Sequence, residues 1–296
     1  KSCLTILLLT SSILAFSQNT NLGVNAGNAG FNNTSIGFAA GDSVTGSSNI
    51  FLGHNSGVRT SSGNQNSILG AFAGYNNKTG LRNTFLGYRA GYSNTTGNDN
   101  TIVGVDAGVS NTISWGNTLI GRWCGNTTTG AYNTFLGTET GKNTTTGEYN
   151  LYAGVQAGRQ NSTGSRNTLL GMQAGFSSTG SNNVFLGYQA GSNETGSNKL
   201  VINATGGMPL VYGDFATKQL GINTTTLGTY TLSVNGDAFA TGLWLSSDRR
   251  FKQNERRIEG ALEKINQVSG VKYQFKNSQT TRERNFSKGD QLGLIA

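Results

Sequence analysis

Asn83-Thr84-Phe85-Leu86-Gly87-Tyr88-Arg89-Ala90-Gly91 is one copy of a motif that recurs eleven times between residues 19 and 191. The glycine that follows Leu86 in this copy returns every 14 to 17 residues, and nearly every step is 16 or 17. A fixed period this short is typical of stacked coils, in which each coil contacts only its neighbours. The repeat predicts a mainly β protein with a parallel β-solenoid or β-roll over residues 18–197.

Composition supports a repeat protein over a disordered chain. Glycine makes up 44 of the 296 residues, charged residues make up only 12%, and there is one proline. Disordered segments are usually far more charged than this. The net charge is +8, but lysine and arginine are not clustered with aromatic residues as in nucleic-acid binders. We therefore expect no nucleic-acid partner.

Residues 1–17 have the pattern of a signal peptide. Lys1 precedes an apolar run, and Ala15-Phe16-Ser17 has the small-x-small pattern of a cleavage site. No later stretch is long and apolar enough to cross a membrane. The sequence predicts a protein that is secreted or held at the bacterial cell surface, with no membrane span once the signal is removed.

An asparagine stands four residues before the motif glycine in every copy. Stacked coils would place these side chains about 4.8 Å apart, so that each amide could bond the next. We therefore predict a structural ladder, and it needs no ligand. The regular part of this ladder comprises Asn66, Asn83, Asn100, Asn117, Asn133, Asn150, Asn167 and Asn183.

Two faces of each predicted strand carry apolar residues. Leu86 stands directly before the glycine, and by alternation along the strand we expect it to share an apolar face with Thr84 and Ala90. The opposite face carries large side chains such as Phe85. A coil this small cannot readily bury both faces, so we expect the second one to be covered by other copies of the chain. That stripe comprises Phe51, Ile68, Phe85, Ile102, Leu119, Phe135, Tyr152, Leu169 and Phe185. The sequence thus predicts a homotrimer.

The Asn-Thr-x-Leu-Gly-x-x-Ala-Gly array resembles the head repeats of trimeric autotransporter adhesins. The resemblance covers residues 19 to 197, and it implies a left-handed parallel β-roll assembled in threes. Residues 198–246 lack the repeat and contain short alternating runs, such as residues 199–203 and 210–213. This region resembles the β stem of phage and bacterial fibres.

The composition changes abruptly at Ser246. Ile258, Ala261, Leu262, Ile265 and Val268 have helical spacing, and residues 271–275 alternate like a strand. Residues 247–296 contain Ser-Asp-x-x-x-Lys, Ala-Leu-x-Lys-Ile, Gly-Val-x-Tyr and Gly-Leu-Ile-Ala. In this order these motifs closely resemble the first part of the intramolecular chaperone of endosialidase-type tail spikes, a self-cleaving trimerisation domain.

This second resemblance implies a cleavage site. It makes Ser247 the nucleophile, Lys252 its base and Ser246–Ser247 the bond that is cut. A serine hydroxyl becomes a strong nucleophile only when a base takes its proton, and a lysine can do so once its pKa is lowered. Arg249 and Arg250 supply nearby positive charge for that purpose. Without the resemblance, the same residues would indicate an exposed turn before a helix.

Other chemistry has little support in the sequence. His54 is the single histidine, so no histidine triad or zinc cluster is expected, and we predict no cofactor and no metal. At most the chain would cut itself once.

The leading hypothesis is a secreted trimeric surface fibre, adhesive or structural, that binds a host glycan or protein receptor. Tyr88, Tyr188 and Trp123 are the candidate glycan contacts. The alternatives are a phage tail fibre or spike, and an ice-binding β-solenoid that presents stacked threonines.

Overall fold

The computed structural model describes residues 19–27, 30–238, 269–273 and 291–295. The chain divides into two compact units, Lys1–Ala238 and Phe239–Ala296. Within the described residues, every regular element is a β-strand. The mainly β class and the parallel solenoid predicted from the repeat are confirmed.

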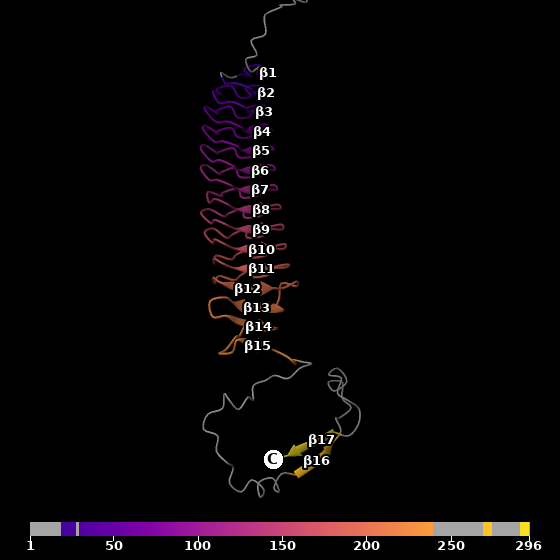
Figure 1. Ribbon diagram of the computed structural model, residues 1–296. Helices are drawn as coiled ribbons and strands as arrows, with labels where there is room; N and C mark the ends of the chain where they lie inside the picture. The colour runs from indigo at the N-terminus through magenta and orange to yellow at the C-terminus, as the bar shows by residue number, and fades with distance from the viewer. Residues whose placement is uncertain (1–18, 28–29, 239–268, 274–290, 296) are drawn as a thin grey trace, which may run out of the picture. The chain divides into compact units, whose positions relative to one another are not determined.

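Each repeat contributes one three-residue strand, and the eleven strands stack in sequence order (Figure 1). The chain therefore winds as successive coils of one turn each. The strands are β1 (Thr20–Leu22), β2 (Thr34–Ile36), β3 (Ile50–Leu52), β4 (Ser67–Leu69), β5 (Thr84–Leu86), β6 (Thr101–Val103), β7 (Thr118–Ile120), β8 (Thr134–Leu136), β9 (Leu151–Ala153), β10 (Thr168–Leu170) and β11 (Val184–Leu186).

Neighbouring coils pair in parallel and in register. Phe85 of β5 lies opposite Ile102 of β6, for example, and Leu86 lies opposite Val103. The same register holds from β1 through β11, although the coils vary in length. Each position of the motif therefore forms a straight column along the stack.

The sheet continues beyond the last repeat. β12 (Lys199–Ile202) pairs in parallel with β11, and β13 (Val211–Asp214) and β14 (Gln219–Ile222) then add as antiparallel strands. β15 (Leu232–Val234) pairs in parallel with β14. The predicted stem strands are thus part of one fifteen-stranded sheet that begins at β1.

The second unit has one described pair of strands. β16 (Ser269–Tyr273) and β17 (Gln291–Ile295) are antiparallel, with Val271 opposite Gly293. The predicted helix over residues 258–268 lies outside the described residues.

Tight corners separate each strand from the rest of its coil. Gly87 has φ +132°, and Arg89 and Gly91 lie in the left-handed region with φ near +54° and +59°. A Cβ atom on Gly87 would lie only 2.6 Å from the carbonyl oxygen of Gly104 in the next coil. The glycine is required both for the backbone angle and for the close approach of the coils.

The motif asparagines from Asn33 onward are buried, and they are hydrogen-bonded from coil to coil. The backbone N–H of Asn133 donates to Oδ1 of Asn117 over 2.8 Å, and its Nδ2 donates to the carbonyl of Gly147 over 2.9 Å. Its own Oδ1 accepts from the backbone N–H of Asn150 at 3.0 Å. Because Gly147 ends the coil that Asn133 begins, one amide closes its own coil and ties it to both neighbours. Equivalent side-chain bonds to the coil-closing carbonyl are made by Asn66, Asn83, Asn100, Asn117, Asn150, Asn167 and Asn183.

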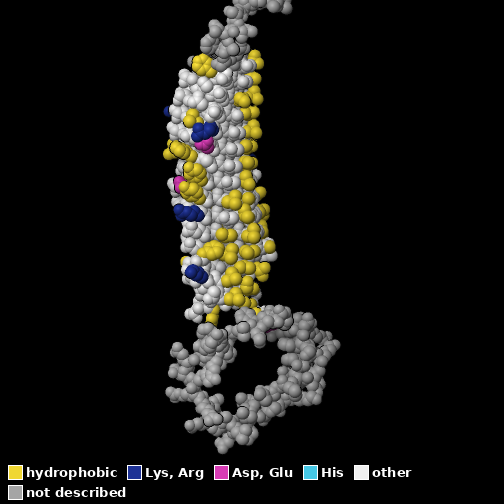
Figure 2. Space-filling view, viewed as in Figure 1, with side chains coloured by type: hydrophobic (Ala, Val, Ile, Leu, Met, Phe, Trp, Pro, Cys, Tyr) yellow, Lys and Arg dark blue, Asp and Glu magenta, His cyan; other side chains and the backbone are white. Residues whose placement is uncertain are grey.

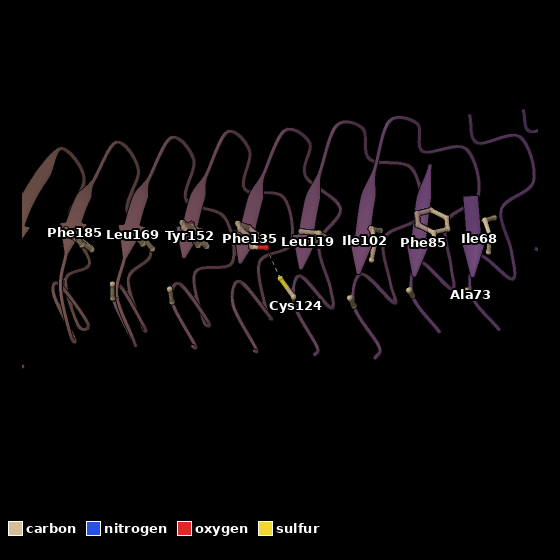
Figure 3. Packing of buried hydrophobic residues seen from close by; sticks show 14 of the residues in the cluster. Ile68, Ala73, Phe85, Ile102, Leu119, Cys124, Phe135, Tyr152, Leu169 and Phe185 are labelled. Carbon is tan, nitrogen blue, oxygen red and sulfur yellow. Dashed lines mark hydrogen bonds between the residues drawn. The ribbon is translucent and has the colours of Figure 1, made fainter. Parts of the chain in front are cut away.

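The interior of the solenoid is a single file of large side chains. Phe85, Phe135 and Tyr152 are fully buried, and each packs within the coils of one chain beside small residues such as Ala90. Figure 3 shows these side chains in a row, one from each strand, facing the small residues of the opposite turn. The prediction that the Phe/Ile stripe needs other copies to bury it was wrong, because this stripe is the core.

The wrong prediction assumed that the alternation of side chains in the strand continues from Leu86 to Ala90. The strand is only three residues long, and the chain turns at Gly87 and again at Arg89 before it reaches Ala90. Side chains alternate between the two faces only within a continuous strand, and here two turns interrupt it. Ala90 therefore faces the interior beside Phe85 and does not share the outer face with Leu86. Thr84 and Leu86 are instead exposed on the outside of the coil.

Cys124 occupies the alanine position of its coil and is fully buried. Its Sγ lies 3.4 Å from the carbonyl oxygen of Phe135. Burial raises the pKa of this thiol to about 12. The thiolate is therefore scarce at neutral pH, and the group behaves as a small apolar side chain.

We predict that Asn133→Ala lowers the free energy of unfolding by about 2–4 kcal/mol, because a buried carbonyl and a buried N–H lose their partner. Chemical denaturation followed by circular dichroism measures the loss. Asn143→Ala is the matched control, since Asn143 is exposed in the same coil. Equal losses in the two variants would contradict a structural role for the ladder.

We predict that Phe135→Ala costs about 3–5 kcal/mol of stability, as expected for an aromatic side chain removed from a packed core. Tyr132→Ala, in the adjoining turn, removes an aromatic ring that is 51% exposed and should cost far less. Thermal melts of the two variants test which side chains are inside. A larger loss at Tyr132 would overturn the assignment.

In a Cys3→Ser background, we predict that Cys124 resists alkylation at pH 8 while the chain is folded. A thiol with a pKa near 12 is almost wholly protonated at that pH, and this one is also enclosed. In denaturant the pKa should return to about 8.5, and alkylation should become fast. Rapid labelling of the folded chain, read by mass spectrometry, would show that the coil opens there.

Candidate functional site

One side of the solenoid is a continuous apolar surface formed by the outward residues of the sheet. In each strand from β2 to β11 the middle side chain is buried and points inward, and the first and third point outward. The third residue is apolar in every strand from β1 to β11, and Leu86, Leu136 and Leu186 are each about two-fifths exposed. We call this surface the outward face, defined as the first and third residues of β1–β11 and the residues aligned with them in β12–β15. Figure 2 shows it as a band of hydrophobic side chains along the stack.

The outward face changes in composition along the chain. Its first column is threonine in β5–β8, for example Thr84 and Thr101. It is aliphatic at Leu151 and Val184, and in β12, β14 and β15. The hydrophobic band in Figure 2 accordingly widens toward the stem. The outward face is therefore most apolar at its C-terminal end.

Charge is almost absent from this surface. The strands β1–β11 contain no charged residue. In β12–β15 the charges are Lys199 and Asp214, whose Nζ and Oδ2 atoms lie 2.7 Å apart. A hydrogen bond from Lys199 lowers the pKa of Asp214, and the same bond raises that of Lys199. Neither residue belongs to the outward face, because Lys199 and Asp214 lie opposite each other outside the two columns that continue from β11. A surface without charged side chains can be covered at low electrostatic cost.

Two apolar grooves open on the outward face at or next to the stem. One has a volume of about 390 Å³ and is lined by Leu200, Gly213, Leu220 and Leu232 among others. The other, of about 510 Å³, is lined by residues that include Ile202, Met208 and Leu210. Gly213 contributes no side chain to its column, so a notch lies between Leu200 and Leu220, its neighbours across the strands.

The remaining charges sit on the other sides of the coil, and several of them form ion pairs. Arg82 and Asp99 form an ion pair of 2.6 Å, and this hydrogen bond lowers the pKa of Asp99. Burial raises the pKa of Glu139, but hydrogen bonds from Gln156, Arg159 and Lys142 outweigh it and leave the pKa lowered. These pairs join successive coils and do not form a reactive cluster.

The predicted glycan contacts do not form one site. Tyr88 and Tyr188 are exposed on the column just after the motif glycine, but a hundred residues of chain separate them. Trp123 has Arg122 and Lys142 over its ring, with the guanidinium carbon and Nζ 3.7 and 4.3 Å from the ring centroid. Its indole N–H donates to Asp106. Trp123 therefore bridges coils within the solenoid.

A different aromatic cluster was missed from the sequence. Trp115, Tyr132 and Tyr149 are each about half exposed on consecutive coils, and the two tyrosine rings stack with centroids 5.3 Å apart. The signal was present, because these residues stand one or two positions before the ladder asparagines. Elsewhere that position is mostly polar, so three aromatics in succession break the pattern.

The predicted cleavage residues Ser247 and Lys252, and the bond Ser246–Ser247, lie outside the described residues. The part of the chain that is described has no cluster of histidine, cysteine and acidic side chains suited to a metal ion. No helix there is long and apolar enough to span a membrane. His54 lies between Phe38 and Phe72, with ring centroids 5.4 and 5.2 Å away.

Comparison with known proteins bears on the C-terminal segment. Residues 247–296 match the family described as chaperone of endosialidase. No curated protein and no solved structure matches the chain. The similarity of the solenoid to adhesin head repeats therefore stays a prediction. The chain thus joins a β-solenoid with a continuous apolar face to a segment that is similar to the endosialidase chaperone.

Proposed function

We propose that this protein is a trimeric fibre of the bacterial cell surface, whose C-terminal segment assembles the trimer and is then cut off. The observation that carries the proposal is the uncharged apolar outward face, which runs along the whole fifteen-stranded sheet. The family match at residues 247–296 supplies a segment suited to assembling copies of the chain.

The outward face favours association of identical copies. Moving a fully exposed leucine side chain out of water contributes about 1.5–3 kcal/mol. The outward leucines are about two-fifths exposed, so each contributes a corresponding fraction, and an apolar residue recurs at this position in every coil. An exposed band of this length would promote aggregation in a monomer. Association around a symmetry axis covers the band and leaves no surface for further growth. The number three comes from the resemblance to trimeric chaperones and adhesins.

A dedicated assembly segment also fits the physics of this fold. The strands contribute three residues each and pair across 14 to 17 residues, so several coils must form before the contacts outweigh the chain entropy. Coils of nearly identical sequence can also pair one repeat out of step. A segment that aligns the same residues of three chains at one end would favour the correct register between their coils.

The release step is a single peptide cleavage at Ser246–Ser247. The Oγ of Ser247 attacks the carbonyl carbon of Ser246, and Lys252 takes the hydroxyl proton. The proton then passes to the departing amine, and water later hydrolyses the ester. Each chain is cut once, so the protein has no external substrate.

The predicted signal peptide favours a surface fibre over a phage tail fibre, since the solenoid and the chaperone segment suit both. The ice-binding hypothesis has less support. Its threonine column is interrupted by Ile50, Leu151 and Val184. A receptor, whether glycan or protein, remains part of the proposal without an assigned site.

We predict that the full-length protein gives a native mass of three chains, each ending at Ser246. Ser247→Ala should give an uncut trimer, because the nucleophile is removed while the assembly segment stays attached. Ser246→Ala is the matched control and should still be cut, since it keeps the nucleophile. Native mass spectrometry reads assembly and cleavage together.

Two results would count against the proposal. A monomeric wild-type protein would remove the fibre role altogether. An uncut wild-type trimer would keep the fibre and remove the release step.

A further inference from the structure

We propose that the exposed aromatic residues Trp115, Tyr132 and Tyr149, here called the aromatic cluster, bind an extended β-linked glycan chain. The proposal gives the receptor role of the proposed function a site and a ligand class, and it rests on that role. It does not depend on the number of chains, because the three residues lie on consecutive coils of one chain.

Tyr132 holds the middle of the aromatic cluster. Its ring stacks on that of Tyr149, with centroids 5.3 Å apart and ring planes 11° from parallel. It also packs against Gly116, where an added Cβ atom would come within 2.8 Å of the Tyr132 ring. The equivalent position carries a side chain in the other coils of the repeat. The glycine therefore makes room for Tyr132, and Tyr132 fixes the orientation of the Tyr149 ring.

The two ends of the aromatic cluster offer free aromatic surface. Trp115 is 50% exposed and Tyr149 is 54% exposed. Among the described residues, no second ring and no cation covers Trp115 or the side of Tyr149 that faces away from Tyr132. Trp115 and Tyr149 belong to turns two coils apart, which is about 10 Å along the stack at the usual spacing of paired strands. The cluster thus presents two aromatic surfaces that follow one another along the solenoid.

The flat faces of pyranose rings suit such surfaces. The C–H bonds on the face of a sugar carry a small positive charge, and the face of an aromatic ring carries the negative part of its quadrupole. A β-linked chain of these rings is extended, so its sugars follow a line as the aromatic cluster does. An α-linked chain coils, and it cannot keep both ends of the cluster in contact.

The surroundings supply hydrogen bonds for sugar hydroxyl groups. The indole N–H of Trp115 and the hydroxyl groups of Tyr132 and Tyr149 have no partner within the part of the chain that is described. Glu148 precedes Tyr149, and Arg166 is the next residue in the column of Tyr149. Neither of these charged side chains forms an ion pair with another described residue. An acceptor and a donor are therefore available beside the free face of Tyr149, and sugar hydroxyls can use both.

The size of the aromatic cluster favours a glycan over a protein partner. A stable protein interface engages about 20–30 residues on each side. Here the aromatic residues occupy three coils, and their column is charged on both sides, with Asp99 before them and Arg166 after them. Ile113 adds one exposed aliphatic side chain near Trp115. The outward face differs, because its apolar column recurs in every coil and suits another copy of the chain.

The experiment measures the binding of cellohexaose and chitohexaose to the full-length protein by isothermal titration calorimetry, with maltohexaose as the α-linked control. Trp115→Ala and Tyr149→Ala each remove one aromatic end of the cluster, whereas Tyr149→Phe keeps the ring and removes only the hydroxyl group. Tyr188→Ala is the matched control, since Tyr188 is an exposed ring outside the cluster. Circular dichroism checks the fold of each variant, and native mass spectrometry counts the chains.

We expect at least one of the two β-linked hexasaccharides to bind, and maltohexaose to bind at least about tenfold more weakly. Trp115→Ala and Tyr149→Ala should each weaken binding roughly tenfold, because each loses a stacking surface. Tyr149→Phe and Tyr188→Ala should stay within about threefold of the wild type. No binding of either β-linked hexasaccharide, or unchanged affinity in Trp115→Ala, would overturn the inference.

The outcomes separate this inference from the proposed function. A trimer that is cut at Ser246–Ser247 but binds neither β-linked hexasaccharide would keep the fibre and remove the glycan site. A monomer that binds them would remove the trimeric fibre and keep the site. Failure of the Trp115→Ala and Tyr149→Ala variants to form trimers would place the aromatic cluster in an interface between copies, and would overturn the inference.

Discussion

The structure depends on the hydrogen bonds of one buried asparagine per coil. Each amide donates to the carbonyl that closes its own coil and accepts from the backbone of the next coil, as Asn133 does with Gly147 and Asn150. A three-residue strand is too short to hold a sheet by itself. The ladder fixes where each coil begins and ends, and the in-register columns follow from it.

Because the coils pair in register, each position of the short motif forms a column that runs along the whole stack. Because Phe85 lies over Ile102 and Leu86 lies over Val103, one motif position supplies the core and the next supplies the exterior. The core is only one side chain wide, so the inside of the coil has little room for a bound ligand. The surface that remains is the outward face, where the absence of charge and the recurrence of leucine both favour other copies of the chain.

The stem extends the same sheet with a different composition. Antiparallel strands β13 and β14 replace the coils, and the outward threonines give way to aliphatic residues and a glycine notch. The change occurs on the side of the sheet that leads to the chaperone-like segment. The outward face is therefore most apolar at the end of the sheet that precedes the chaperone-like segment in the sequence.

The sequence alone determined the period, the parallel solenoid and the asparagine ladder positions, since each depends on local spacing. It also indicated the chaperone segment, whose motifs are contiguous. Only the tertiary structure decided which apolar column is inside. That choice depends on the corners at Gly87 and Arg89, which break strand alternation before the chain reaches Ala90. The apolar grooves and the Trp115–Tyr132–Tyr149 cluster likewise depend on contacts between coils, which no single repeat contains.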